Sequence, residues 1–283
     1  MIKLICPLKN PLLIILLSLS FSAFAQAPIR FKIEAGYGLG MPTGSYLVSK
    51  NEIFLSTFSL EKIQTAGGLQ LGASIGSELK NGIRLSAHFH YQKTGNQTYR
   101  DYQNYLDTNN PTELLTSENV YSINYQTISF SPLITLILSD INSPFKPFIS
   151  VGPTMILSGQ NERKADYYDV QLSQNISSVK IDKFSLSFGA RASLGFERQL
   201  NEDFSLQVSA QFRCAYLEPS SYTFTKYYVD GVDQLQSLSL REREGVYVND
   251  ASFQGDPNQP QQTLHPELAW LGADLMLGIV YKL

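Results

Sequence analysis

The sequence contains few cysteines, few histidines and few charged residues. Its 283 residues include only two Cys, three His and one Trp, and charged residues make up 17%. Two cysteines exclude a disulfide-rich domain and a paired-cysteine metal site. The balance of 22 Lys+Arg against 25 Asp+Glu argues against nucleic-acid binding, which needs a basic patch. Gly-rich phosphate loops and nucleophile elbows are missing, so we expect no enzyme, no catalytic residues and no cofactor.

Long apolar runs are also missing, which excludes a helical membrane protein. The longest run, residues 11–19, follows Lys3 and Lys9 and leads to small residues at Ala23 and Ala25. A basic start, a short apolar core and small residues at the end predict a secretory signal peptide over residues 1–25. The expected mature chain is one domain, residues 26–283, which retains only one of the two cysteines, Cys214.

What the sequence has in abundance is alternation of apolar and polar residues, the signature of β-strands. In the first segment Ile29, Phe31 and Ile33 lie on one face, whereas Arg30 and Lys32 lie on the other. Eight segments alternate in this way, namely residues 29–39, 69–79, 83–91, 121–138, 145–157, 184–196, 204–216 and 271–283. Each is long enough to cross a bilayer as a tilted strand of about 9–11 residues.

The connections between these segments alternate between short and long. Three are short, around residues 80–82, 139–144 and 199–203, and four are long, about residues 41–66, 95–118, 159–180 and 218–265. Short turns at one end and long loops at the other are typical of outer-membrane barrels. We therefore predict an all-β fold: an eight-stranded antiparallel up-and-down transmembrane β-barrel with short periplasmic turns and four long extracellular loops.

Alternation alone allows two barrels, a soluble one with its apolar face inward and a membrane one with its apolar face outward. The polar face is rich in Gly, Ser, Thr and Gln and carries few Lys or Glu, unlike a solvated surface. Small polar residues suit the crowded interior of eight strands. This favours the membrane barrel and a location in the outer membrane of a Gram-negative bacterium.

Charged residues of the polar face would then lie inside the barrel, where isolated ions are costly and must be paired. Counting along antiparallel strands places six of them near mid-barrel or somewhat beyond it: Glu34, His88, His90, Arg191, Arg213 and Asp274. The set predicts a salt-bridged plug, with a narrow or gated polar path and a catalytic interior as alternatives. His88 and His90 share a face, as metal ligands can, but no third ligand is evident, so we predict no metal.

Three local features mark departures from a regular barrel. The fourth segment changes phase near residues 126–127, which predicts a β-bulge there. Pro132 and Pro153 remove hydrogen-bond donors from adjacent strands, which predicts a weakened or bulged seam that serves curvature or a lateral gate. In the longest connection, Asp230 and Gly231 predict a hairpin with a type I′ turn between residues 222–229 and 232–240.

Tyrosines recur in the long connections near the ends of the strands. They are expected either to form an aromatic girdle at the membrane interface or to contact a partner or glycan. The loop-contact candidates are Tyr102, Tyr105, Tyr167, Tyr168, Tyr227 and Tyr228.

From about residue 27 to residue 283 the chain resembles the PorT-like family of eight-stranded outer-membrane barrels (the OmpA/OmpX type) that is common in Bacteroidota. The resemblance is carried by residues 128–134 (ISFSPLI), 146–153 (KPFISVGP), 194–197 (LGFE) and 278–283 (GIVYKL). The chain departs from the pattern at Leu283, where such barrels usually end in an aromatic residue. The resemblance implies a fold and a location and supplies no catalytic residues.

The expected function is that of a non-enzymatic outer-membrane protein whose exposed loops mediate surface or partner interactions. The alternatives are a small pore or transporter for small solutes, and a barrel component of a secretion or gliding assembly. Expected partners are outer-membrane lipid and lipopolysaccharide, the barrel-assembly machinery during insertion, and a protein partner at the loops; nucleic acid is not expected.

Overall fold

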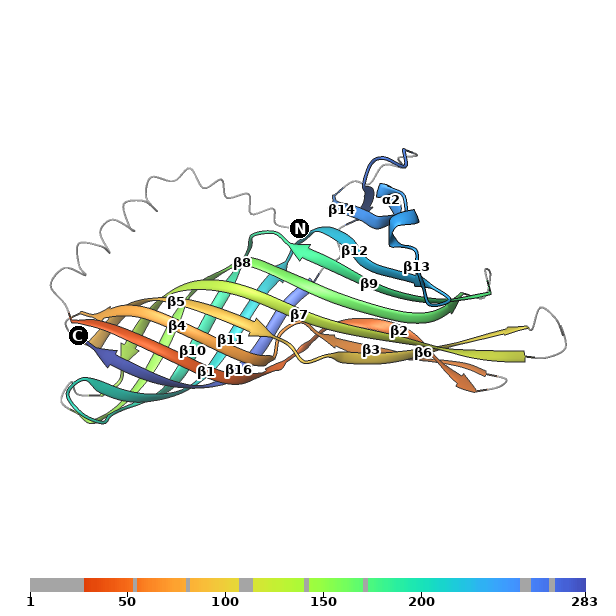
Figure 1. Ribbon diagram of the computed structural model, residues 1–283. Helices are drawn as coiled ribbons and strands as arrows, with labels where there is room; N and C mark the ends of the chain where they lie inside the picture. The colour runs from red at the N-terminus through yellow and green to blue at the C-terminus, as the bar shows by residue number, and fades with distance from the viewer. Residues whose placement is uncertain are drawn as a thin grey trace.

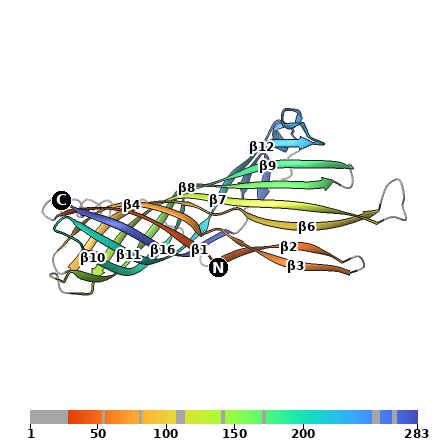
Figure 2. The same cartoon turned by 60° about the horizontal axis from the view of Figure 1, so that its bottom comes forward.

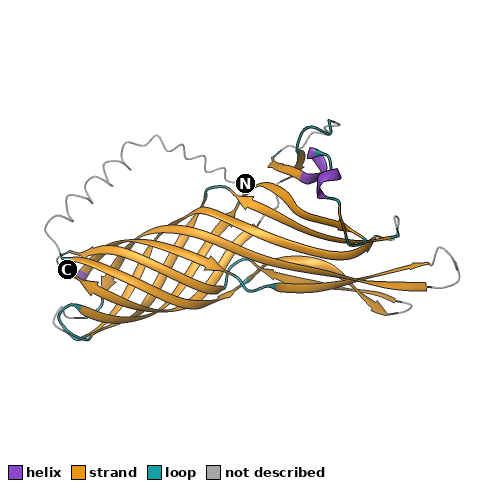
Figure 3. Cartoon of the chain, in the orientation of Figure 1, coloured by secondary structure: helices purple, strands orange, loops and turns teal. Residues whose placement is uncertain are grey.

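The computed structural model describes most of the chain from residue 28 onward and consists mainly of strands (Figure 3). Among the described residues, no helix is long and apolar enough to span a membrane. The predicted signal peptide, residues 1–25, lies outside the described part. The described ranges are residues 28–52, 55–79, 82–106, 114–139, 143–169, 173–249, 256–264 and 268–283.

Eight antiparallel strands close into a ring, each paired with its neighbours along the chain, and β16 returns to β1 (Figure 1). These strands match the eight alternating segments, so the predicted eight-stranded up-and-down barrel is confirmed. They are β1 (Ile29–Gly40), β4 (Gly68–Glu78), β5 (Ile83–Lys93), β7 (Leu114–Ile137), β8 (Phe145–Asp169), β10 (Ser187–Gln199), β11 (Phe204–Leu217) and β16 (Leu268–Lys282).

The apolar face of these strands points outward. Ile33 and Leu275 are 74% and 65% exposed, whereas Arg191 on the opposite face is 1% exposed. The inward positions carry Ser, Thr, Gln and charged side chains, most of them buried. The barrel is thus inverted relative to a soluble one, with polar groups inside and an apolar belt outside.

At one end of the barrel the connections are short, as predicted. Between β10 and β11, the Asn201 side chain accepts hydrogen bonds from the backbone N–H groups of Asp203 and Phe204, at 3.1 and 2.7 Å. Between β4 and β5, Gly82 has a φ of 72°, which a glycine adopts without strain. Such local turns fix the register of the strands that they join.

At the other end the four connections are long, as predicted, and they carry strands of their own. β7 and β8 run for 24 and 25 residues and continue beyond the ring. Their unpaired backbone groups need partners, which the flanking connections supply. β6 (Gln97–Leu106) pairs with β7, β9 (Gln174–Phe184) with β8 and β12 (Pro219–Val229) with β9, while β2 (Pro42–Glu52) and β3 (Leu55–Gln64) form a separate hairpin (Figure 2).

The hairpin expected after residue 222 is correct at its turn and wrong in its return strand. Asp230 and Gly231 both have positive φ, 48° and 81°, as a type I′ turn requires. The return strand β13 (Val232–Asp233) has only two residues and leads into a short 3-10 helix, after which a capping box of Ser239 and Glu242 starts an α-helix. The chain continues as η2 (Leu235–Ser237), α2 (Leu240–Arg243), β14 (Glu244–Val248) on β12, and β15 (Gln261–Leu264) parallel to β14.

The bulge predicted near residues 126–127 is also wrong. β7 keeps its phase, and Ile123 and Tyr125 point inward because the interior itself becomes apolar at that end. The irregularity lies on β8, where Ile128 pairs with Ser158 and Ser129 with Ile156, so Leu157 is the extra residue. This is where β8 exchanges its barrel partner β10 for β9.

Candidate functional site

The centre of the barrel is organised around one buried carboxylate. Glu34 on β1 receives the Lys32 ammonium at 2.8 Å on Oε2 and the His90 ring nitrogen Nε2 at 2.8 Å on Oε1. Arg191 from β10 and His88 from β5 lie 3.4 and 3.7 Å from the same Oε1. The alternation of β1, β5 and β10 turns these side chains inward at one depth, so four of the six predicted interior residues form this central layer.

The other two predicted residues form a layer nearer the long strands. Arg213 on β11 donates to Asp274 Oδ1 on β16 at 2.7 Å and to Gln92 Oε1 at 2.9 Å. Its guanidinium lies 4.4 Å from the ring centroid of Trp270, whose indole N–H also donates to Gln92, at 3.0 Å. All four side chains are buried, so this outer layer fills the lumen with paired polar groups.

A third layer lies near the short turns. Arg30 and Arg84 each contact two carboxylates: Glu78, at 2.7 and 2.9 Å, and Glu197. Lys146 on β8 pairs in register with Glu197 on β10 and is 9% exposed. Ion pairs therefore occupy the lumen at three successive depths.

Beyond the outer layer lies a cluster of buried apolar side chains. Its members come from the ring strands β7, β8, β11 and β16, from β9 and from residue 66: Ala66, Ile123, Tyr125, Ile156, Phe184, Ala215, Leu217 and Trp270. Sequence reasoning missed this cluster. Its signal is the loss of alternation at the end of β11, where residues 214–217 (CAYL) are apolar on both faces.

Glu34 is a candidate third metal ligand beside His88 and His90. The sequence alone placed Glu34 in the interior but did not identify it as a ligand. Ligand atoms of Glu34, His88 and His90 lie within 4.8 Å of one another, which is compatible with a metal site after small shifts. Lys32 and Arg191 contact the same carboxylate, and a divalent cation would have to displace both of them. In the structure the Glu34 carboxylate thus already has two cationic partners.

The same residues include a Ser–His pair. Ser86 Oγ and His88 Nε2 are 2.9 Å apart, but the other ring nitrogen of His88 is 3.7 Å from Glu34, beyond hydrogen-bond range. The pair lies within the lumen among the ion pairs.

A second polar cluster lies outside the ring, on the sheet of β8, β9, β12 and β14. Asp182, buried on β9, accepts hydrogen bonds from Asn161 at 3.0 Å and Tyr247 at 2.8 Å and contacts Arg163 at 2.8 Å. Lys180 lies 3.6 Å from the Tyr222 ring centroid. Burial and the Asp182 charge raise the pKa of Tyr247 above its ordinary 10.0, and burial lowers the pKa of Lys180. The cluster fastens β14 to the sheet.

The structure separates the tyrosine candidates into two groups. Tyr167 and Tyr168 lie at the end of β8, and Tyr227 and Tyr228 lie on β12. Strand β9 runs between β8 and β12 and brings the two pairs near each other: Tyr167 pairs with Ile176, and Tyr228 pairs with the adjacent Ser177. Burial and the nearby Tyr227 raise the pKa of Tyr167. Tyr102 and Tyr105 lie instead on β6, across β7.

Pro132 and Pro153 lie on adjacent strands of the ring. The β7–β8 ladder pairs Phe130 with Met155 and next Ile134 with Val151, so both prolines fall within an interrupted stretch. This stretch lies in the barrel wall, on the short-turn side of the bulge at Leu157.

No protein-family model matches the chain, and no curated protein does. Similar solved structures cover nearly all of it at low identity. Neisserial surface protein A is 9% identical (90% of this chain, 97% of that one, TM-score 0.39), and the outer membrane protein OprG from Pseudomonas aeruginosa is 12% identical (91% and 97%, TM-score 0.41). Ail, the attachment invasion locus protein of Yersinia pestis, is 12% identical (90% and 99%, TM-score 0.28).

Proposed function

We propose that this chain is a non-enzymatic outer-membrane β-barrel of a Gram-negative bacterium, exported with a cleaved signal peptide of residues 1–25. The observation that carries the proposal is the belt of exposed large apolar side chains on the outward faces of the eight strands. Soluble proteins rarely expose contiguous apolar patches larger than a few hundred Å². In a bilayer this belt contacts lipid, and closure of the ring leaves no free sheet edge in the hydrocarbon.

The barrel acts as a closed anchor rather than as a pore. Three layers of ion pairs cross its lumen and leave only a small cavity between two of them, and the apolar cluster around Trp270 covers the end toward the long strands. An apolar constriction resists wetting, so ions would meet a barrier even between the polar layers.

The surface that contacts a partner is then formed by the strands that extend beyond the ring. We assign the short turns to the periplasm and the extended strands to the cell surface, where the tyrosines at the ends of β8 and β12 would contact a protein partner. Aromatic side chains on a paired sheet offer contact area at little cost in conformational entropy. Lipid and lipopolysaccharide would surround the belt, and the barrel-assembly machinery would insert the chain. The resemblance to PorT-like barrels of Bacteroidota is in keeping with this assignment.

Membrane fractionation and heat-modifiable migration test the location. We expect the mature chain to start at residue 26, to fractionate with outer membranes and to migrate faster when unheated. A mature chain found in the soluble fraction would contradict the membrane assignment.

Planar-bilayer recordings test closure. We expect no sustained conductance from the unmodified barrel or from the Trp270→Phe control, and openings from Trp270→Ala, because only Ala empties the cluster. Sustained conductance of the unmodified barrel that changes with Arg191→Gln would instead support a small pore.

Purification from native membranes tests the partner. A protein that copurifies with the unmodified chain, and is lost when Tyr167 and Tyr227 are replaced by Ser, would support the tyrosine surface. Recovery of the barrel alone would count against both a surface partner and membership of a larger secretion or gliding assembly.

A further inference from the structure

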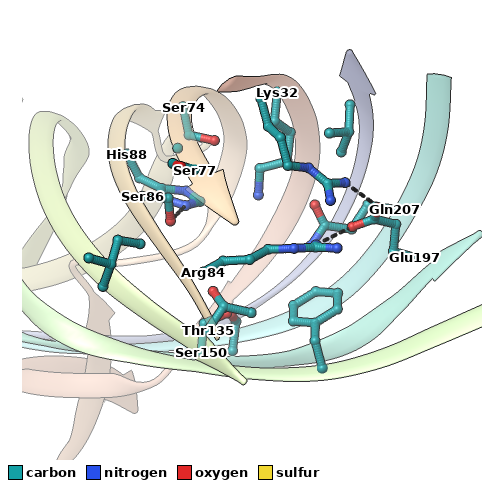
Figure 4. A pocket seen from close by; sticks show the side chains of 16 residues that line it. Lys32, Ser74, Ser77, Arg84, Ser86, His88, Thr135, Ser150, Glu197 and Gln207 are labelled. Atoms are coloured by element: carbon teal, nitrogen blue, oxygen red, sulfur yellow. Dashed lines mark hydrogen bonds and ion pairs between the residues drawn. The ribbon is translucent and has the colours of Figure 1, made fainter. Parts of the chain in front are cut away.

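The lumen contains a cavity between the central layer and the layer near the short turns (Figure 4). All eight strands contribute to its lining, which is dominated by hydroxyl and cationic side chains. Its volume is about 60 Å³. Because one water needs roughly 10–15 Å³ of such space, the cavity has room for about four to six waters or one small polyatomic ion.

The charges of the lumen as a whole do not balance. Among the described residues, six cationic side chains point into the lumen: Arg30, Lys32, Arg84, Lys146, Arg191 and Arg213. The ion pairs of the three layers supply four carboxylates: Glu34, Glu78, Glu197 and Asp274. The lumen therefore holds two more cationic than anionic side chains, and uncompensated charge in a confined, poorly solvated space favours binding of a counter-anion.

Two donors that line the cavity have unused hydrogen-bonding capacity. Arg84 NH2 and Ser77 Oγ are buried, and neither has a hydrogen-bond partner among the residues described. Figure 4 shows Arg84 reaching across the cavity toward Glu197, with Ser77 and Ser74 on the neighbouring wall and Lys32 on another side. Guanidinium, ammonium and hydroxyl groups that converge in this way match the acceptor oxygens of a tetrahedral oxyanion.

We propose that this cavity binds one small inorganic oxyanion of the phosphate or sulfate type. Lys32 and Arg84 supply the charge, and Ser77 supplies a hydroxyl donor. The ion enters from the short-turn end, because the apolar cluster covers the opposite end. The site depends only on the folded lumen and is independent of any surface partner.

Equilibrium dialysis with radiolabelled inorganic phosphate tests the proposal on the full chain folded in maltoside micelles, which contain no phosphate. Sodium chloride keeps the ionic strength constant, so that general screening does not vary. We expect saturable binding of one phosphate per barrel and competition by sulfate. Absence of saturable binding, or a stoichiometry well above one, would overturn the site.

Substitutions locate the bound ion. Arg84→Gln is expected to weaken binding about tenfold, as the loss of a charge-assisted hydrogen bond predicts, while Arg30 still holds Glu78 and Glu197. Ser77→Ala is expected to weaken binding about threefold through the loss of one neutral hydrogen bond. The control Arg198→Gln removes the same charge from the exposed residue next to Glu197 and should leave binding unchanged.

The outcomes separate the proposal from general charge attraction. If Arg84→Gln and Arg198→Gln weaken phosphate binding equally, the binding depends only on the net charge of the protein, and the site is rejected. If Arg84→Gln does not fold, as judged by heat-modifiable migration, Ser77→Ala decides. That variant removes a hydroxyl for which the described residues supply no partner, so unchanged phosphate binding by the folded variant would reject Ser77 and the assigned cavity.

Discussion

The Arg213–Asp274 pair allows a quantitative test of how the lumen is stabilised. Both side chains are 1% exposed, and they are joined at 2.7 Å. Arg213→Met keeps much of the side-chain length and removes the guanidinium, which leaves a buried carboxylate without its ion-pair partner. Breaking a buried pair in this way costs about 3–5 kcal/mol of the free energy of unfolding.

The reciprocal change is expected to cost less. In Asp274→Asn, Arg213 retains the Gln92 side chain at 2.9 Å and its stacking on Trp270. We therefore expect a loss of about 1–3 kcal/mol, the range for one charged hydrogen bond. The double variant contains neither charge, so it should be more stable than Arg213→Met alone, with a coupling energy of about 1–3 kcal/mol.

Trp270 provides the assay, because it is the only tryptophan in the sequence and is fully buried in the apolar cluster. Its fluorescence is followed during urea unfolding from short-chain liposomes, and the midpoints are compared at equal slopes. Lys93→Met, on the exposed face of β5, is the control and should stay within about 0.5 kcal/mol of the unmodified chain.

The reasoning is refuted by either of two results. Arg213→Met within about 1 kcal/mol of the unmodified chain would mean that the lumen solvates Asp274 without its partner. A double variant destabilised by the sum of the two single changes would mean that the two side chains do not interact across the 2.7 Å contact.

Three further changes test other parts of the structure. Gly36→Ala should abolish the heat-modifiable folded form, because the added Cβ would lie 2.1 Å from the Leu275 backbone oxygen. The control Gly95→Ala should fold, because its Cβ would meet nothing within 4 Å. A folded Gly36→Ala barrel would contradict the β1–β16 register. Cys214, exposed on the outward face, should react in liposomes with a lipid-soluble maleimide but not with a charged one; equal labelling by both would place it outside the bilayer. The raised pKa of Tyr247 contributes stability below pH 10 that is lost as pH rises through its folded pKa, whereas the lowered pKa of Lys180 acts in the opposite direction. The denaturation midpoint should therefore fall less above pH 10 in Tyr247→Phe than in the unmodified chain, and identical pH profiles would remove the role of Tyr247.

The ring and its central layer could be predicted because their causes are local. An outward-facing apolar belt imposes strict alternation, and counting along strands of known direction fixes the depth of each inward residue. Glu34 pairs with Gly72, and Gly72 with His90, so one register brings the carboxylate and the imidazole together.

The extended strands could not be predicted, because their stability comes from distant partners. β9 reads QNISSVKIDKF, with no regular apolar face, and forms because β8 and β12 pair with its two edges. The bulge at Leu157 could not be predicted either, because it depends on which strands pair with β8. Leu157 and Ser158 are both outward, and only the change of partner from β10 to β9 explains the shift in phase.

The lengths of β7 and β8 have an electrostatic consequence. Of about 25 residues, roughly 10 cross the hydrocarbon, so about 15 residues at roughly 3.3 Å each extend some 50 Å along the strand direction. With a tilt of about 40°, their ends stand roughly 35–40 Å from the edge of the hydrocarbon. This is several times the Debye length of about 8 Å at physiological salt. Tyr167 and its neighbours therefore lie beyond the reach of the anionic lipid surface, and a partner would sense the charge of these strands rather than that of the membrane.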